Sequence, residues 1–453
     1  MPHPARPSLA ILAMPFLLLS AATIGPPACS TTPRSSDSSS SPAQPPTKLD
    51  ARTQNRCEDL KLMLDCVTAK HADPFFRTAK TEFMAAAEAL KSQAGTLDEH
   101  IWAVELAKLT AMIGDAHTRL VLVAGSPPCQ TSTTIHFVAL SDGLFVDAAP
   151  SNHLDLLGAR LIAVDDTPVE QLAARFRRFM ASETDADARL VAAAYLKYDH
   201  VLHALGVLDA PGRITYVVSS ARAAAENHAT DGASLRRVTL ESAPDESPWS
   251  GAVLPDPRTT PLPPGRQVRK ELYWSELLEQ NRILLCRYDR CADMPDKSVS
   301  AWALEVMRDA EKHKPRAIAV DLRRNSGGNS GLLHPLIDRL RSWKQSDPTR
   351  RVYALVGPMT FSSGVTNALD LRSFAGAILV GGEPGQAIGS FGEVRKLHLP
   401  GCGLDVTYAT TRRDDPRAPL PVMIDVSAPM TSEAYFAGRD PAIEAIAARD
   451  DRP

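Results

Sequence analysis

The chain has 453 residues, of which 44% are hydrophobic and 23% are charged. This composition is ordinary for a globular protein, and the length is enough for two or three domains with hydrophobic cores. The formal net charge is -3 and no basic run stands out, which excludes nucleic acid as an expected partner.

The first 50 residues do not read as part of the fold. An apolar run follows Arg6 over residues 9–24 and is too short for a membrane span, so we predict an export signal over residues 1–29. Cys29 follows a small residue, which predicts a lipoprotein signal with lipid attachment at Cys29; cleavage by an ordinary signal peptidase is the alternative. Residues 30–50, rich in Ser, Pro and Thr, are expected to form a flexible tether.

Export to the periplasm or cell envelope follows from this reading, with membrane contact only through the N-terminal lipid anchor. Six cysteines follow Cys29, and an even number in an exported chain permits three disulfides. Local pairs and one long-range pair are the natural candidates: Cys57–Cys66, Cys286–Cys291 and Cys129–Cys402. The sequence leaves this connectivity open, and free buried thiols are the alternative.

Residues 51–125 are expected to form a helical N-terminal region. Thr96 and Glu99 form a capping box, and the apolar residues behind them recur on one helical face. Gly114 ends this helix, so His117 is expected just beyond a helix end and beside a strand-like run over residues 119–123.

Residues 126–241 are expected to form a small β-rich module, followed by a proline-rich linker over residues 242–268. The module is interrupted by one predicted helix, Val169–Phe179. Its predicted strands have alternating or β-branched sequences and are bounded by turn residues: Ile135–Leu140, Leu144–Ala148, Arg160–Val164, Arg213–Val218 and Leu235–Glu241.

Residues 269–449 alternate strands and helices, which predicts a largely parallel sheet with right-handed crossovers. The predicted strands are Arg282–Arg287, Ala317–Leu322, Val352–Val356 and Ala377–Val380. The predicted helices cover residues 298–312, about 330–343 and 365–374. Ligands in such sheets bind at the carboxyl ends of the strands, where two polar turns lie.

One of these turns contains Ser362, between a buried strand and a helix. A serine there can expose its hydroxyl while the amide of Ser363 points the same way, which provides a nucleophile and one oxyanion donor. The alternative is that Ser362 only caps the helix. The other turn contains Gly327 and Gly328, whose amides are candidates for the second oxyanion donor because glycines let the backbone approach a ligand closely.

A set of motifs in order resembles the carboxy-terminal processing (tail-specific) serine proteases and the tricorn protease core, over most of residues 57–449. The motifs are Gly114-Asp115-Ala116-His117-Thr118, Asp321 through Asn329, Thr360-Phe361-Ser362-Ser363-Gly364, Val380-Gly381-Gly382-Glu383-Pro384, and Thr431 through Pro441. The resemblance implies an α/β chain (α+β overall) with a crotonase-like ββα core, a helical N-terminal region and a small PDZ-like β module. Peptides or unfolded proteins are the implied substrates.

This chain lacks one residue that part of the family uses for catalysis, and its absence indicates which of two branches the chain resembles. Bacterial processing proteases use a Ser–Lys dyad, but residues 383–393 contain no lysine, and Lys396 is expected on the following strand. The chain therefore resembles the tricorn-core-like, histidine-containing branch, in which His117 is the implied base. A carboxylate should orient this histidine, and Asp115, Glu393 and Asp425 are the candidates.

The predicted function is thus a serine-type peptidase with Ser362 as nucleophile and His117 as base. The alternative is a catalytically inactive family member that binds peptides or another ligand. No cofactor is expected, and no metal is expected because the chain has no His-Glu-x-x-His and no paired cysteine spacing suited to zinc. The substrate preference and the oligomeric state stay open.

Overall fold

A computed structural model describes residues 50–219, 235–245, 252–253, 267, 269–280, 282–389, 391–412 and 421–450. The predicted export signal with Cys29, and the tether up to residue 49, lie outside the described residues. Among the described helices, none is both long and apolar enough to span a bilayer.

Three helices form the N-terminal region, as predicted: α1 (Ala51–Lys70), α2 (Lys80–Ser92) and α3 (Glu99–Ala111). The helix cap was predicted wrongly. Asp98, not Thr96, is the N-cap of α3, and its carboxylate accepts a hydrogen bond of 2.8 Å from the amide of Ile101. Asp98 lies directly before the helix and needs no reciprocal Glu99 bond to satisfy an exposed amide.

The β-rich module contains the predicted strands, the predicted helix, and two α-helices and one short 3-10 helix that were not predicted. Its main sheet has the order β10-β4-β5-β7-β8, with β3 paired to β4 and β6 to β5, while β2 pairs with β9. The strands are β2 (Thr131–Ser132), β3 (His136–Leu140), β4 (Gly143–Pro150), β5 (Arg160–Val164), β6 (Thr167–Pro168), β7 (Arg213–Ser219), β8 (Leu235–Glu241), β9 (Ala243–Pro244) and β10 (Ala252–Val253). The helices are η1 (Ser151–Leu156), α4 (Val169–Phe179), α5 (Asp185–Tyr195) and α6 (Asp199–Ala204).

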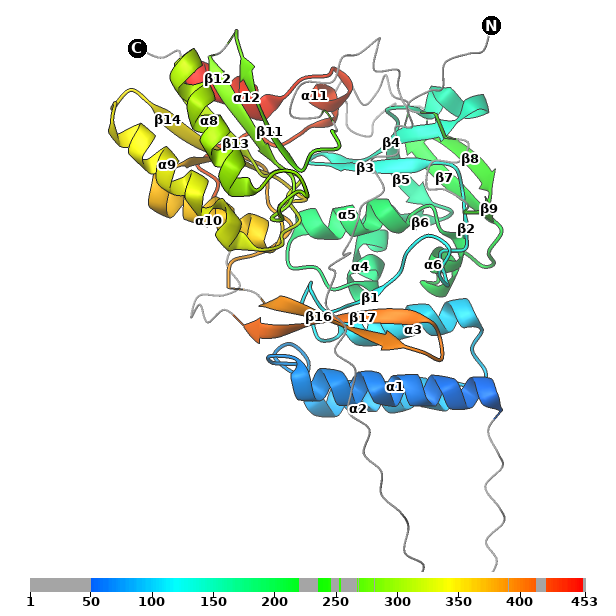
Figure 1. Cartoon of the computed structure of the whole chain (residues 1–453). Helices are drawn as coiled ribbons and strands as arrows, with labels where there is room; N and C mark the ends of the chain where they lie inside the picture. The colour runs from blue at the N-terminus through cyan, green and yellow to red at the C-terminus, as the bar shows by residue number, and fades with distance from the viewer. Residues whose placement is uncertain are drawn as a thin grey trace, which may run out of the picture.

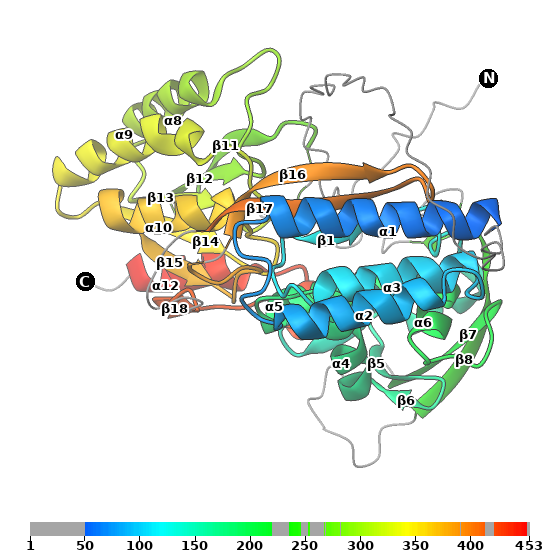
Figure 2. The same cartoon turned by 90° about the horizontal axis from the view of Figure 1, so that it is seen from below.

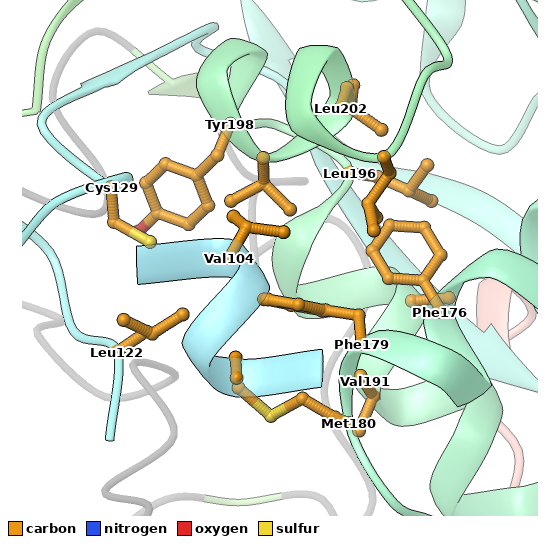
Figure 3. Packing of buried hydrophobic residues seen from close by; sticks show 14 of the residues in the cluster. Val104, Leu122, Cys129, Phe176, Phe179, Met180, Val191, Leu196, Tyr198 and Leu202 are labelled. Carbon is orange, nitrogen blue, oxygen red and sulfur yellow. The ribbon is translucent and has the colours of Figure 1, made fainter. Parts of the chain in front are cut away.

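The helical region and the module share one hydrophobic core. Figure 3 shows Val104 of α3 packed among Phe176 and Phe179 of α4 and Leu196 and Tyr198, which follow α5. All five side chains are buried. Burial of this apolar surface holds the two parts together as one packed body.

The predicted parallel sheet is confirmed. Its order is β11-β12-β13-β14-β15-β18, parallel throughout except for β11 at one edge. Its strands are β11 (Tyr273–Leu278), β12 (Ile283–Tyr288), β13 (Ala317–Asp321), β14 (Arg351–Val356), β15 (Ile378–Gly381) and β18 (Val426–Ser427). Helices α8 (Val299–His313), α9 (His334–Gln345) and α10 (Ser363–Ala375) cover one face, and α12 (Pro441–Asp450) covers the other (Figure 1). The short helices η3 (Ser330–Leu333) and α11 (Ser432–Phe436) complete the part that is described.

A hairpin from late in the chain lies against the N-terminal region. Strands β16 (Phe391–Leu399) and β17 (Leu404–Arg412) form a separate sheet with β1 (Arg119–Val121), in the order β1-β17-β16. Figure 2 shows this hairpin beside α1, and its residues Leu399, Leu404 and Val406 are buried in the same core as α1. The pairing joins residues almost 290 positions apart, because Arg119 lies opposite Thr407.

The predicted disulfides are absent. All six cysteines that the structure describes are free. Cys57 and Cys66 both lie on α1, nine residues apart, so about 13 Å of helix axis separates them, well beyond the reach of a disulfide. The thiol of Cys291 instead contacts the side-chain oxygens of Asn325 at 3.3 Å and Asn367 at 3.2 Å.

Candidate active site

The turn before Ser362 is bound to the end of the neighbouring strand. The hydroxyl of Thr360 donates to the carbonyl of Leu322 at 2.8 Å and accepts from the amide of Gly357 at 3.0 Å. The amide of Phe361 donates to the carbonyl of Asn325 at 2.9 Å. Since β13 and β14 are parallel neighbours, these bonds bring the two predicted polar turns together.

Ser362 itself has a strained backbone and an unused side chain. Its φ of 52° and ψ of -125° lie outside the regions that non-glycine residues prefer. Ser362 is the N-cap position of α10, but its side chain makes no capping bond, nor any other hydrogen bond within the part of the chain that is described. The helix-cap alternative therefore does not account for this serine, and its strained turn is the kind that presents a nucleophile.

The three amides proposed as oxyanion donors differ in the structure. The amide of Gly327 already donates to the side-chain oxygen of Asn325 at 2.9 Å. The amides of Gly328 and Ser363 donate to no acceptor among the described residues. The hydroxyl of Ser363 binds the carbonyl of Gly328 at 2.6 Å and so holds these two residues together. Gly328 and Ser363 thus remain the two available donors.

Gly327 has a steric role instead. A Cβ at this position would lie 2.7 Å from the Cβ of Ser362 and 3.1 Å from the amide nitrogen of Ser363, at a φ of +109°. Only glycine fits this close approach. Gly327 was predicted as a possible oxyanion donor. In the structure its amide is already bound, and its role is to leave room for Ser362.

In the serine peptidase that the sequence predicts, Gly327→Ala should lower kcat about 100-fold, because the new methyl group must displace Ser362 and small displacements at a reacting centre are costly. The matched control is Gly392→Ala, whose Cβ would meet only Thr411 at 3.6 Å. Circular dichroism should show both variants folded. Equal kcat values for the two variants would contradict the spacing role of Gly327.

His117 lies in a short loop that Asp115 organises. The carboxylate of Asp115 accepts from the backbone amide of His117 at 2.8 Å and from the hydroxyl of Thr118 at 2.5 Å. Gly114 precedes it with a φ of +84°, where only glycine is unstrained. From β17, the hydroxyl of Thr407 donates to the carbonyl of His117 at 2.8 Å. The distant hairpin therefore fixes the backbone of the candidate base.

Of the three carboxylates proposed to orient His117, the structure brings only Asp115 to it. The Oδ1 atom of Asp115 lies 3.5 Å from Nδ1 of His117, and both side chains are buried. Glu393 is exposed on β16. Asp425 is exposed and binds Arg372 at 2.9 Å. Neither can orient His117, because Glu393 on β16 and Asp425 directly before β18 lie on the surface.

Three further side chains, not found from the sequence, complete the surroundings. The ring nitrogen Nε2 of His71 lies 3.1 Å from Asp115. Glu183 accepts long hydrogen bonds from the amides of Ala116 at 3.4 Å and Ala387 at 3.3 Å. The side-chain oxygen of Gln386 binds the amide of Ser362. Isolated residues of these types carry no sequence signal, and only the fold brings them together.

Two contacts join the serine side of the site to the histidine side. The ring of His117 packs against the ring of Phe361, the residue before Ser362, with centroids 4.7 Å apart. Glu183 bridges the loop of His117 to the segment of Gln386. Lys396, in contrast, pairs with Asp405 on the exposed hairpin at 2.9 Å. In the stretch where the Ser–Lys branch carries its lysine, the residue that reaches Ser362 is Gln386.

The pKa values of the two carboxyl groups near His117 are shifted in opposite directions. Burial disfavours the charge of Asp115, but the nearby His117, at 3.5 Å, and the hydrogen bond from His71 outweigh it and hold the pKa of Asp115 below its usual value. Burial raises the pKa of Glu183 to about 7, against a smaller lowering effect of His117. Asp115, His117 and Glu183 are also the described side chains whose ligand atoms lie close enough together to hold a metal ion.

Buried ion pairs hold the strand ends behind this site. Arg323 binds Asp321 through two bonds of 3.0 and 2.7 Å and Asp440 through two bonds of 2.8 and 2.9 Å. Arg287 adds a bond of 3.0 Å to Asp321. Glu383 accepts from the amide of Ala186 at 2.9 Å, at the start of α5. Asp321, Glu383 and Asp440 each belong to one of the motifs that carry the family resemblance. In this structure each of these carboxylates accepts hydrogen bonds that hold the fold together.

No family model matches the sequence, and no curated protein matches it either. The solved structure of mature CPAF aligns with a TM-score of 0.59 over 88% of this chain and 97% of the CPAF chain, at 13% identity. The chain has the fold of mature CPAF. Mature CPAF complexed with lactacystin aligns equally, with a TM-score of 0.58, 13% identity and coverage of 88% and 98%.

A protease structure gives a weaker alignment. The photosystem II D1 C-terminal processing protease aligns over 88% of this chain and 97% of its own, with a TM-score of 0.40 and 15% identity. The likeness to mature CPAF confirms the predicted α/β fold class with helices and several sheets. At 13% identity it shows the fold alone, and the PDZ-like character of the module stays a prediction.

Proposed function

We propose that the chain is a serine-type peptidase of the histidine-assisted, tricorn-core-like branch. The observation that carries the proposal is the turn of Ser362. A serine with a strained backbone and an uncommitted hydroxyl lies next to two amides, of Gly328 and Ser363, that donate to no described acceptor. Such a combination of nucleophile and oxyanion donors suits acyl transfer. The CPAF fold supports the same reading.

In the proposed mechanism, the Oγ of Ser362 attacks the carbonyl carbon of a peptide bond and His117 takes the hydroxyl proton. The amides of Ser363 and Gly328 donate to the oxyanion that forms. Collapse of this intermediate breaks the C–N bond, and the leaving amine takes the proton from His117. Water then attacks the acyl-enzyme by the same route, which releases the acid and restores Ser362.

The residues around His117 fit the role of a base. Asp115 is held ionised by its hydrogen bonds and stabilises the imidazolium that forms on proton transfer. The ring of Phe361 limits the movement of the imidazole. Gln386 binds the amide of Ser362 and so preserves the strained turn. His71 in turn holds Asp115, which makes it a positioning residue.

The proposed substrates are peptides or unfolded proteins in the cell envelope, as the resemblance implies. Export and the lipid anchor at Cys29 belong to the same proposal.

Labelling with a fluorophosphonate probe tests the proposal, because such probes react only with an activated serine. We expect the folded chain to gain one label, located at Ser362 by mass spectrometry, and to hydrolyse an unfolded protein such as casein. Heat-denatured chain is the control and should gain none. No label on folded protein that still binds casein would instead favour the inactive, peptide-binding alternative.

A further inference from the structure

A cluster of possible metal ligands lies around His117, where no sequence motif indicated one. Asp115 and His117 come from the loop after α3, and Glu183 comes from the segment before α5. One ligand atom from each of these residues lies within 4.8 Å of the others. Glu183 lies more than 60 positions after the other two residues, so the spacing rules used for zinc motifs do not detect the set.

The imidazole of His117 is incompletely satisfied without a further ligand. The residue is 3% exposed, and neither of its ring nitrogens has a hydrogen-bond partner among the described groups. Oδ1 of Asp115 lies 3.5 Å from Nδ1, beyond normal hydrogen-bond length. A buried polar group without a partner costs free energy, so a ligand that binds this lone pair is favoured.

The carboxylates of Asp115 and Glu183 are placed so that both can bind the same cation as His117. Both hydrogen bonds to Glu183 are long, 3.4 and 3.3 Å, so little is lost when its oxygens turn to a cation. Asp115 is held from behind by His71 at 3.1 Å and by the hydroxyl of Thr118. Metal-binding carboxylates are commonly oriented by such outer hydrogen bonds.

We propose that Asp115, His117 and Glu183 bind a Zn²⁺ ion, and that the bound ion inhibits the peptidase by occupying the lone pair of His117. One imidazole nitrogen and two carboxylate oxygens are a ligand set that zinc accepts, whereas Mg²⁺ and Ca²⁺ prefer oxygen alone. Ligand atoms around tetrahedral zinc lie about 3.3 Å apart, so the side chains must close in, mainly Glu183. The inhibitory effect rests on the proposed function, but the binding does not.

Calorimetric titration with ZnCl₂ tests the binding, using the Ser362→Ala chain so that no turnover is involved. We expect one ion per chain, and an affinity at least 10-fold lower in chains that also carry Glu183→Gln or His117→Ala. The matched control is Glu170→Gln, at an exposed position on α4, and its affinity should be unchanged. Circular dichroism should confirm that each variant is folded. If the Glu183→Gln and His117→Ala chains bind Zn²⁺ as tightly as the Ser362→Ala chain does, the proposed site is wrong.

The inhibition is measured on the chain with Ser362 intact. Saturating Zn²⁺ should slow fluorophosphonate labelling of Ser362 at least 10-fold, and EDTA should restore the rate. In Glu183→Gln the ratio of rates with and without the same Zn²⁺ should approach one. Labelling that Zn²⁺ does not slow would overturn the inhibition. Absence of any labelling, with zinc binding intact, would refute the proposed peptidase and leave the metal site established.

Discussion

Ser362→Ala is expected to lower kcat/KM for hydrolysis of an unfolded protein by at least 1000-fold. The substitution removes the only atom that can form the acyl-enzyme in the proposed mechanism. His117→Ala should cost a similar factor, and the double variant should be no worse than either single one, because the two residues act as one unit. Initial rates with casein or a fluorogenic peptide measure the effect.

The control for this series lies on α10, the helix that follows Ser362. Ser373→Ala changes an exposed serine of α10 and should leave kcat/KM within two-fold of the unaltered chain. Since the side chain of Ser362 caps nothing, its removal should also leave the melting temperature almost unchanged. Full activity of Ser362→Ala would refute the mechanism. A large drop in melting temperature would show that Ser362 has a structural role after all.

Arg323→Ala is expected to lower the free energy of unfolding by about 3–5 kcal/mol, the usual result of removing one partner from a buried ion pair. Asp321 is fully buried and Asp440 is 5% exposed. Without the Arg323 side chain, Asp440 loses both of the bonds it receives from this guanidinium. Asp321 keeps Arg287 as its charged partner and the bond from the backbone amide of residue 323. Urea-induced unfolding at pH 7 measures the change.

The control is Arg341→Ala, which breaks an exposed pair with Asp338 and should cost less than about 1 kcal/mol. Burial opposes the charge of Asp321, but Arg323 and Arg287 hold its pKa at about 2, below its ordinary 3.8. The stability that this charge contributes is present above pH 3.8 and is lost as the pH falls towards 2. The difference between the Arg323 variant and the unaltered chain should therefore narrow in acid. Equal effects of the two arginine substitutions at pH 7 would contradict a stabilising role of the buried ion pairs of Arg323.

The parallel core could be predicted closely from local patterns. The strands that end at Asp321 and Val356 are short apolar runs, and each is followed by a polar turn. Parallel topology then requires the two turns to lie at the same edge. This rule is why the turn of Ser362 could be predicted to lie beside the turn of Gly327 and Gly328. What local patterns missed were α5 and α6, which lie among strands and whose helical signal is weak.

The surroundings of His117 show the limit of such reasoning. Asp115 was one of three carboxylates that the sequence could not rank, and the structure places only Asp115 against the histidine. Glu183 and Gln386 were not candidates, because a glutamate or glutamine without a motif is usually a surface residue. Their positions depend on contacts between segments more than 200 residues apart, such as Glu183 with Ala387.

The sequence by itself determined the periodic elements, the parallel sheet and the polar turns at its edge, because these depend on hydrophobic period and on turn chemistry within a few residues. Only the tertiary structure decided which groups meet. It placed β17 against the loop of His117, turned Gly327 from a donor into a spacer, left the cysteines unpaired and gathered Asp115, His117 and Glu183. Those outcomes depend on long-range packing, in which the geometry of the whole chain fixes distances that no local pattern contains.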